Sequence, residues 1–281
     1  MEWTLGRILG RGSTATVCIA TCHNSDELLA VKSVELHRSE FLQREAKILS
    51  SLNSPYVIGY RGAETKIESN GVVTYNLLME YAPYGTLTDA TAKNGGRFEE
   101  ESMVVKYTRE ILLGLEYIHS MGIAHCDVKG SNVVVSEKGE AKIADFGCSR
   151  RVNTGFESTI MGTPAFMAPE VARGEKQGKE SDIWAVGCTV IEMVTGSPPW
   201  KEEEPVSVLY RVGSPTSVTD QMYWRSVEEE EEAEELQGDS RDLDRLNLWS
   251  CHLERFQRLR FVDVLDGPKW DMEGGDWIMV R

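Results

Sequence analysis

The sequence predicts an α+β protein of two lobes, a small β-rich lobe with one helix followed by a mainly helical lobe. Three observations support this fold class. Short β-like runs fill residues 5–34, two more strand-like runs follow a single helical stretch, and apolar residues recur at helical spacing beyond residue 99. A chain of 281 residues is long enough to bury a substantial core, and this length suits either one large domain or two lobes around a cleft.

The first lobe is expected to begin with an antiparallel hairpin and a third strand. A β-like run ends at Leu9, a glycine-rich turn occupies residues 10–17, and further runs follow at 18–21 and 28–34. Glycine in such a turn lets the backbone approach another group closely. The hairpin is therefore a candidate phosphate-binding element.

One helix and two more strands should complete this lobe. Apolar residues within 39–52 recur at helical spacing between charged ones, which predicts a single helix. Residues 56–60 and 72–80 are strand-like, and Ala82-Pro83-Tyr84-Gly85 then indicates a turn. An antiparallel sheet of five strands with one helix would thus occupy residues 3–82.

The second lobe, expected over residues 83–212, is predicted to be mainly helical. Residues 99–120 carry apolar side chains on one helical face, whereas 184–195 is apolar nearly all round and predicts a buried helix. The longest nearly apolar stretch contains Glu192 and is too short to cross a bilayer. With no leader at the start, we expect an intracellular protein of the cytoplasm or the nucleus, without a membrane span.

Composition excludes several function classes. The formal net charge of −15 argues against nucleic acid as a partner, because a phosphate-binding face needs clustered Lys and Arg. The six cysteines lack the paired spacing of a zinc site and the density of a disulfide scaffold. They are expected to be reduced thiols.

Two acid-bearing motifs carry the strongest functional signal. His-Cys-Asp-Val-Lys-Gly-Ser-Asn occupies residues 125–132, and Asp145-Phe146-Gly147 begins thirteen residues after Asn132. Transfer of a γ-phosphoryl group needs a carboxylate that takes a hydroxyl proton, and oxygen ligands that hold Mg²⁺ against the nucleotide. Asp127, Asn132 and Asp145 supply these parts. Each motif alone arises by chance, but their order and spacing indicate phosphoryl transfer.

A nucleotide clamp is expected upstream of these motifs. A strand rather than a helix is predicted after Gly10 and Gly12, which disfavours a dinucleotide-binding loop. Lys32 on the third strand could reach the α- and β-phosphates if Glu45 on the helix held it in place. Taken singly, such a Lys and Glu are usually solvated surface charges. Their position between the glycine turn and the two acid motifs favours an ion pair.

The ordered set of motifs resembles the eukaryotic protein kinases of the Ser/Thr group over about residues 3–212. The amino-acid sequence of residues 9–13, 80–83 and 161–170 is similar to that of plant MAP kinase kinase kinases of the MEKK-like type. The resemblance rests on these residues: Gly10, Gly12, Lys32, Glu45, His125, Cys126, Asp127, Asn132, Asp145, Phe146, Gly147, Ala168, Pro169, Glu170 and Asp182.

The resemblance implies a bilobal kinase that uses ATP and Mg²⁺ to phosphorylate protein Ser or Thr, here on a MAP kinase kinase. Asp127 would be the catalytic base and Lys129 its electrostatic partner, while Asn132 and Asp145 would hold Mg²⁺. Glu80 and Ala82 would pair with adenine through their backbone. The implied nucleotide-binding residues are Leu9, Gly10, Gly12, Val17, Ala30, Lys32, Glu45, Glu80, Ala82, Asn132 and Asp145.

One departure from the family pattern concerns regulation. Cys126 stands where many members carry an Arg that receives an activation-loop phosphate. A thiol cannot form those charge-assisted hydrogen bonds. Phosphorylation of Ser158 or Thr159 is therefore expected to matter less for switching than in arginine-bearing relatives.

A second departure is the end of the resemblance after residue 212, which predicts an incomplete helical lobe. Residues 213–281 form an acidic tail, with seven Glu at 228–235 and an apolar stripe within 241–260. Three explanations stay open: a solvated segment, an amphipathic helix that covers the lobe or docks a partner, or an altered reading frame or splice. The incomplete lobe also leaves a second function open, a catalytically weak nucleotide-binding scaffold.

Overall fold

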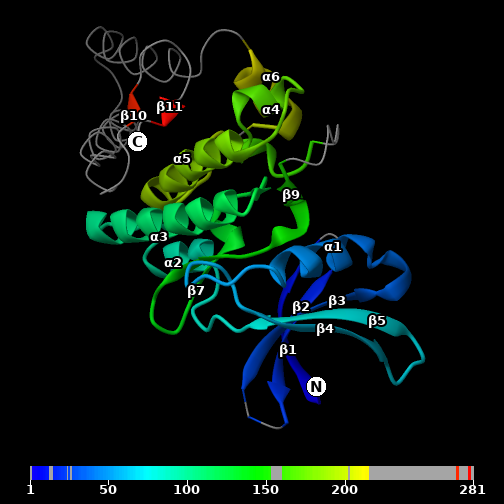
Figure 1. Ribbon diagram of the computed structural model, residues 1–281. Coiled ribbons are helices and arrows are strands. Elements are labelled where there is room, and N and C mark those ends of the chain that lie inside the picture. Colours follow the sequence, from blue (N-terminus) through cyan, green and yellow to red (C-terminus); the bar gives the residue numbers. More distant parts are fainter. Residues whose placement is uncertain are drawn as a thin grey trace, which may run out of the picture.

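A computed structural model describes residues 2–214 except 13–14, 24, 26, 153–159 and 202, together with the backbone of 270–271 and 278–279. Figure 1 shows a sheet with one helix, α1, packed on it, and a separate group of helices beyond them. The chain passes from the first part to the second after the last strand of the sheet. The predicted two-lobed α+β fold is confirmed.

The first lobe is a five-stranded antiparallel sheet with the strand order β1-β2-β3-β5-β4. Gly10 pairs with Val17 across the glycine-rich turn, so a strand does follow this turn as predicted. Helix α1 (Glu40–Leu49) packs on the sheet and buries Leu42, Ala46 and Leu49. The strands are β1 (Trp3–Arg11), β2 (Thr16–Cys22), β3 (Leu28–Glu35), β4 (Tyr60–Ile67) and β5 (Val73–Glu80).

The fourth strand does not lie where the apolar pattern predicted it. Residues 56–60 were expected to be a strand, but β4 begins only at Tyr60. Val57 and Ile58 are buried because they pair with the second lobe, where the Ile58 amide donates to the Ile143 carbonyl at 2.9 Å. Their apolar character reflects this contact between lobes. The true strand has a mixed sequence because it is an edge strand.

Two long helices form the centre of the second lobe. They are α3 (Glu101–Ser120) and α5 (Lys179–Thr195), close to the predicted 99–120 and 184–195, although α5 begins earlier. Fully buried side chains such as Ile111, Leu115 and Met193 each stabilise the fold by about 2 kcal/mol. Three further helices were not predicted: α2 (Leu87–Lys93), α4 (Pro169–Ala172) and α6 (Pro205–Gly213).

Short strands and 3₁₀ turns between α3 and α5 carry the residues that face the first lobe. The segment 125–132 lies between the paired elements β6–β9 and β7–β8, and Asp145 is the second residue after β8. The strands are β6 (Ile123–Ala124), β7 (Val133–Val135), β8 (Ala141–Ile143) and β9 (Arg150–Arg151). The 3₁₀ turns are η1 (Leu36–Arg38), η2 (Gly130–Asn132), η3 (Phe146–Cys148) and η4 (Pro164–Phe166).

Beyond residue 214 only β10 (Trp270–Asp271) and β11 (Ile278–Met279) are described, and they pair antiparallel. The acidic run 228–235 and the proposed amphipathic helix 241–260 lie outside the described residues. Within the part that is described, none of the helices has the length and apolar character that a membrane span requires.

Candidate active site

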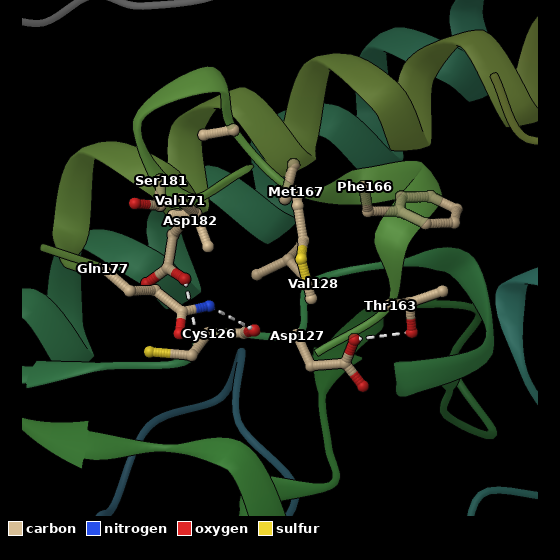
Figure 2. A pocket seen from close by; sticks show the side chains of 12 residues that line it. Cys126, Asp127, Val128, Thr163, Phe166, Met167, Val171, Gln177, Ser181 and Asp182 are labelled. Atoms are coloured by element: carbon tan, nitrogen blue, oxygen red, sulfur yellow. Dashed lines mark hydrogen bonds between the residues drawn. The ribbon is translucent and has the colours of Figure 1, made fainter. Parts of the chain in front are cut away.

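The backbone before Asp127 is held by a buried carboxylate on α5. The Asp182 side chain is 1% exposed and accepts hydrogen bonds at 2.8 Å from the His125 amide, the Cys126 amide and the His119 ring. A buried charge is tolerated when several donors stabilise it in this way. The N-terminal turn of α5 therefore fixes the loop that carries Asp127 (Figure 2).

The ring of His125 connects this loop to the segment after β8. Its Nδ1 lies 3.3 Å from the Asp127 amide and its Nε2 lies 3.0 Å from the Ala144 carbonyl, so Nδ1 accepts and Nε2 carries the proton. The ring also meets Phe146 edge-on, with the centroids 5.1 Å apart. The two acid motifs are thus packed against each other.

Both carboxylate oxygens of Asp127 have partners. Oδ1 accepts from the Thr163 hydroxyl at 2.8 Å, and Oδ2 accepts from Asn132 Nδ2 at 2.8 Å and from Lys129 Nζ at 2.9 Å. Lys129 also donates to the Thr163 hydroxyl. These contacts orient Asp127 and place a positive charge beside it. The structure therefore brings the predicted base, its Lys partner and Asn132 together.

The ammonium group of Lys32 bridges two carboxylates from separate elements. Its Nζ lies 2.7 Å from Glu45 Oε2 on α1 and 2.9 Å from Asp145 Oδ1. The Glu45 side chain is only 3% exposed, so neither it nor Lys32 is the solvated surface charge that an isolated residue of its type would be. The geometry assembles the predicted clamp from β3, α1 and the second acid motif.

Burial and mutual attraction oppose each other in this cluster. Burial by itself lowers the pKa of Lys32, but Glu45 and Asp145 outweigh it and raise that pKa above its ordinary value. Burial raises the pKa of Glu45, and the attraction to Lys32 offsets only part of this rise. For Asp145 burial acts in the same direction, yet Lys32 prevails and the pKa is lowered. Lys32 and Asp145 are therefore both charged at neutral pH.

Asp145 has the backbone and exposure expected of a cation ligand. Its φ of 58° is in the left-handed region, and the Gly147 amide donates to its side chain at 3.3 Å. The side chain is 49% exposed, and Asn132 lies nearby because its carbonyl accepts from the Ala144 amide. Among the described residues there is no cluster of three His, Cys, Asp or Glu side chains that could hold a metal alone.

One carboxylate and one carboxamide fit Mg²⁺, which keeps water and phosphate oxygens as its other ligands. A site of this kind needs few protein donors, and Asn132 and Asp145 are of the required oxygen type. The residues present therefore fit the cofactor that the sequence implied.

The remaining predicted nucleotide residues lie on the first lobe and its connector. Gly10 has open space where a side chain would start, and the Gly12 amide donates to the Ala15 carbonyl at 2.9 Å. The other predicted contacts are Leu9 and Val17 beside this turn, Ala30 on β3, and Glu80 and Ala82 at the end of β5 and just beyond it.

Sequence reasoning missed an ion pair behind the connector. The Glu80 carboxylate accepts from Lys142 Nζ on β8 at 2.7 and 2.9 Å, and from the Gly59 amide at 3.1 Å. The pattern offered no signal for this pair, because the two residues are 62 positions apart and each looks like an ordinary charge.

A second missed residue is Glu192 on α5. Its carboxylate accepts from the Gly130 amide at 3.0 Å and from the Thr88 hydroxyl at 3.0 Å. A side chain at position 130 would collide with it, since a Cβ atom there would lie 2.7 Å from Glu192. The single charge within the apolar stretch 184–195 was the available signal, because a buried carboxylate needs partners.

Glu170, one of the residues that carry the family resemblance, is not a buried, unpaired charge. The side chain is partly exposed and accepts from the Ser181 hydroxyl at 2.9 Å. Solvent and this hydrogen bond remove the large desolvation penalty.

Comparison with known proteins agrees with this arrangement. The family model for the protein kinase domain matches residues 3–268. The chain is 66% identical to mitogen-activated protein kinase kinase kinase 17 of Arabidopsis thaliana, over 100% of this chain and 93% of the relative. It is 56% identical to mitogen-activated protein kinase kinase kinase 18 of the same plant, over 100% of this chain and 99% of the relative.

The length of the first alignment bears on the acidic tail. It spans 347 positions, whereas this chain has 281 residues, so 347 − 281 = 66 positions hold no residue of this chain. The alignment nevertheless covers the whole chain, the tail included.

Proposed function

Because this chain belongs to the protein kinase family, as a Ser/Thr kinase of the MAP kinase kinase kinase group, we propose that its substrates are MAP kinase kinases. Two relatives whose names state this activity align with the whole chain. The observation that carries the catalytic proposal is the bridge from Lys32 to Glu45 and Asp145, beside an Asp127 bonded through both oxygens.

In this proposal Asp127 accepts the proton of the substrate hydroxyl as that oxygen attacks the γ-phosphorus of ATP, while the bond from this phosphorus to the β–γ bridging oxygen breaks and ADP leaves. Lys129 and Asn132 hold the carboxylate in place through Oδ2, and Thr163 holds it through Oδ1. Lys129 is also close enough to offset charge on the transferring group. Such general base catalysis contributes about 10²–10⁴-fold to a rate.

The kinase domain implies the use of ATP. Lys32, anchored by Glu45, would bind the α- and β-phosphates, and Asn132 and Asp145 would hold Mg²⁺. When bound, this cation neutralises charge on the phosphate oxygens. The glycine-rich turn with Leu9, Gly10, Gly12 and Val17 would cover the phosphates, while Ala30 and the backbone of Glu80 and Ala82 would enclose adenine.

The proposed boundaries follow the sequence pattern. The kinase domain would comprise residues 3–212, with a first lobe of about 3–82 and a second of about 83–212, followed by the acidic tail 213–281. We place the protein inside the cell, in the cytoplasm, the nucleus or both, where its proposed substrates and ATP are available.

A direct test is phosphate transfer from ATP to a purified MAP kinase kinase, beside a generic basic protein and with Asp127→Asn as the control. We expect phosphorylated Ser or Thr on the MAP kinase kinase, at a rate that Asp127→Asn lowers by about 10²–10⁴-fold. ATP binding without turnover would instead support the scaffold function. Equal rates on both proteins would contradict the substrate proposal.

A further inference from the structure

The side-chain amide of Gln177 lies buried beneath the catalytic loop and uses both of its ends. It is 7% exposed. Nε2 donates to the Cys126 carbonyl at 3.1 Å and to the Met161 carbonyl at 2.8 Å. Oε1 accepts from Arg150 Nη2 at 3.1 Å and from the Met161 amide at 3.4 Å. The amide therefore has all the partners that its two donors and one acceptor oxygen can take.

These partners belong to three different segments of the site. Cys126 precedes the base Asp127, Arg150 is on β9 shortly after Asp145, and Met161 is two residues before Thr163. Figure 2 shows the Gln177 amide directed at the Cys126 backbone, on the opposite side of the loop from the Thr163 contact to Asp127. One side chain thus connects the catalytic loop to the segment that supplies Thr163.

The backbone between Met161 and Thr163 is adapted to this close contact. Gly162 has a φ of 116°, and a Cβ atom there would lie 2.5 Å from the Cys126 carbonyl oxygen. Only glycine avoids both the strained backbone and the collision. The segment can therefore lie directly on the catalytic loop, and the next residue, Thr163, reaches Asp127 at 2.8 Å.

The groups that residue 126 itself offers are uncharged, although the Arg150 guanidinium lies beside both the Cys126 thiol and the Gln177 amide. Burial, followed by the nearby Asp182 carboxylate, raises the pKa of the Cys126 thiol to about 12, so it is neutral at physiological pH. Where an Arg would offer a cation to a phosphorylated segment, this chain offers a thiol and a backbone carbonyl. The carbonyl is the acceptor that Gln177 uses.

We propose that Gln177 is a positioning residue that holds residues 161–163 on the catalytic loop through uncharged hydrogen bonds, without a phosphate on the preceding segment. It acts on catalysis through Thr163, which orients Asp127. The proposal rests on the phosphoryl transfer proposed above, because its catalytic effect is exerted through Asp127. Its structural part, the attachment of residues 161–163, is independent of turnover.

The test compares Gln177→Leu and Gln177→Glu with Thr189→Val in the full chain. Leu removes all the hydrogen bonds, and Glu keeps the shape but loses both donors. Thr189 is fully buried on α5, and its hydroxyl bonds the Ala185 carbonyl at 2.8 Å, so its variant removes a buried hydrogen bond elsewhere on the helix. The readouts are ADP affinity, turnover per ADP-binding site, melting temperature and amide hydrogen exchange of residues 161–163.

We expect both Gln177 variants to lower turnover per site about tenfold or more, a loss that corresponds to one hydrogen-bonded contact or more. Their affinity for ADP should stay within about twofold of wild type. Amide exchange of 161–163 should rise about tenfold in both, and Thr189→Val should change neither quantity. Wild-type protein treated with phosphatase should keep most of its turnover. Unchanged exchange at 161–163 in both variants, or exchange that rises equally in Thr189→Val, would overturn the proposal.

Two further outcomes separate the proposals. A wild-type protein that loses turnover about tenfold on phosphatase treatment would also overturn the role given to Gln177. A wild-type protein without any turnover would overturn the kinase proposal alone, because the exchange measurement still decides whether Gln177 holds the segment.

Discussion

Removal of the Lys32 ammonium should cost stability as well as activity, by an amount that depends on pH. In Lys32→Met, Glu45 would be left with a carboxylate that is 3% exposed and has lost its ion-pair partner. Such a group takes up a proton instead of staying charged. With an ordinary pKa of 4.5, protonation of Glu45 at pH 7 costs about 3 kcal/mol, which is the upper limit of the loss relative to wild type because the pKa of Glu45 is already raised there. This value is close to the typical cost of breaking a buried ion pair.

The sign of the pH dependence follows from the same group. In the variant, Glu45 is neutral when folded and charged when unfolded above its ordinary pKa, so the destabilisation relative to wild type grows as the pH rises. At about pH 5 it should shrink to roughly 1 kcal/mol. A cost of about 3 kcal/mol at pH 7 lowers the melting temperature of a domain of this size by about 6–12 °C.

Differential scanning calorimetry of wild type, Lys32→Met and the double variant Lys32→Met/Glu45→Gln at the two pH values measures these shifts. The double variant should recover at least half of the loss at pH 7, because an amide carries no charge to bury. Turnover should be absent in both variants, since the clamp for the phosphates is gone. A melting-point difference that does not vary with pH, or a double variant as unstable as Lys32→Met, would refute the reasoning.

Four other perturbations test separate parts of the site. Asp127→Asn should lower kcat by about 10²–10⁴-fold with the KM for ATP unchanged, as measured by steady-state kinetics. Gly162→Ala should lower turnover about tenfold while ADP binding persists in calorimetry, because its Cβ collides with the Cys126 carbonyl. Folding lowers the pKa of Asp145, so its charged form stabilises the fold above about pH 4 and this contribution is lost in stronger acid. Acid unfolding of Asp145→Asn, followed by circular dichroism, should therefore be less steep than that of wild type. Thr159→Ala should keep most of the wild-type turnover, and a large loss restored by an acidic residue there would contradict the role given to Cys126.

Much of the active site could be predicted from sequence because its chemistry dictates residue types at fixed order. Asp127, Asn132 and Asp145 were found from the needs of phosphoryl transfer, and the structure places them on adjoining segments. Lys32 and Glu45 were paired only by their context, and they lie 2.7 Å apart. Their roles in nucleotide binding remain proposals.

Two of the residues that sequence reasoning missed act partly through backbone groups. Gln177 bonds the backbone of Cys126 and Met161, and Glu192 bonds the Gly130 amide; every residue carries such groups, so no partner type appears in the sequence. Their positions follow from how α5 lies under the catalytic loop. Tertiary packing of this kind leaves no local pattern, and a structure is needed to find it.

The error in the fourth strand has a related cause. Val57 and Ile58 are apolar because they meet the second lobe, and an apolar run of this length cannot be told from a strand. Apolar and polar residues alternate only weakly along the edge strand β4, because part of this strand faces solvent. Helix α2 was missed since it has only seven residues, although its capping box of Thr86 and Asp89 was present in the sequence.

The ion pair between Glu80 and Lys142 has a mechanical consequence for nucleotide exchange. It fastens the last strand of the first lobe to the hairpin that precedes Asp145, immediately behind the connector. If the lobes separate while this ion pair is kept, we expect them to rotate about it, and the tip near Gly10 and Gly12 would then move farther than the connector. Spent nucleotide would leave by its phosphate end first, with adenine released last.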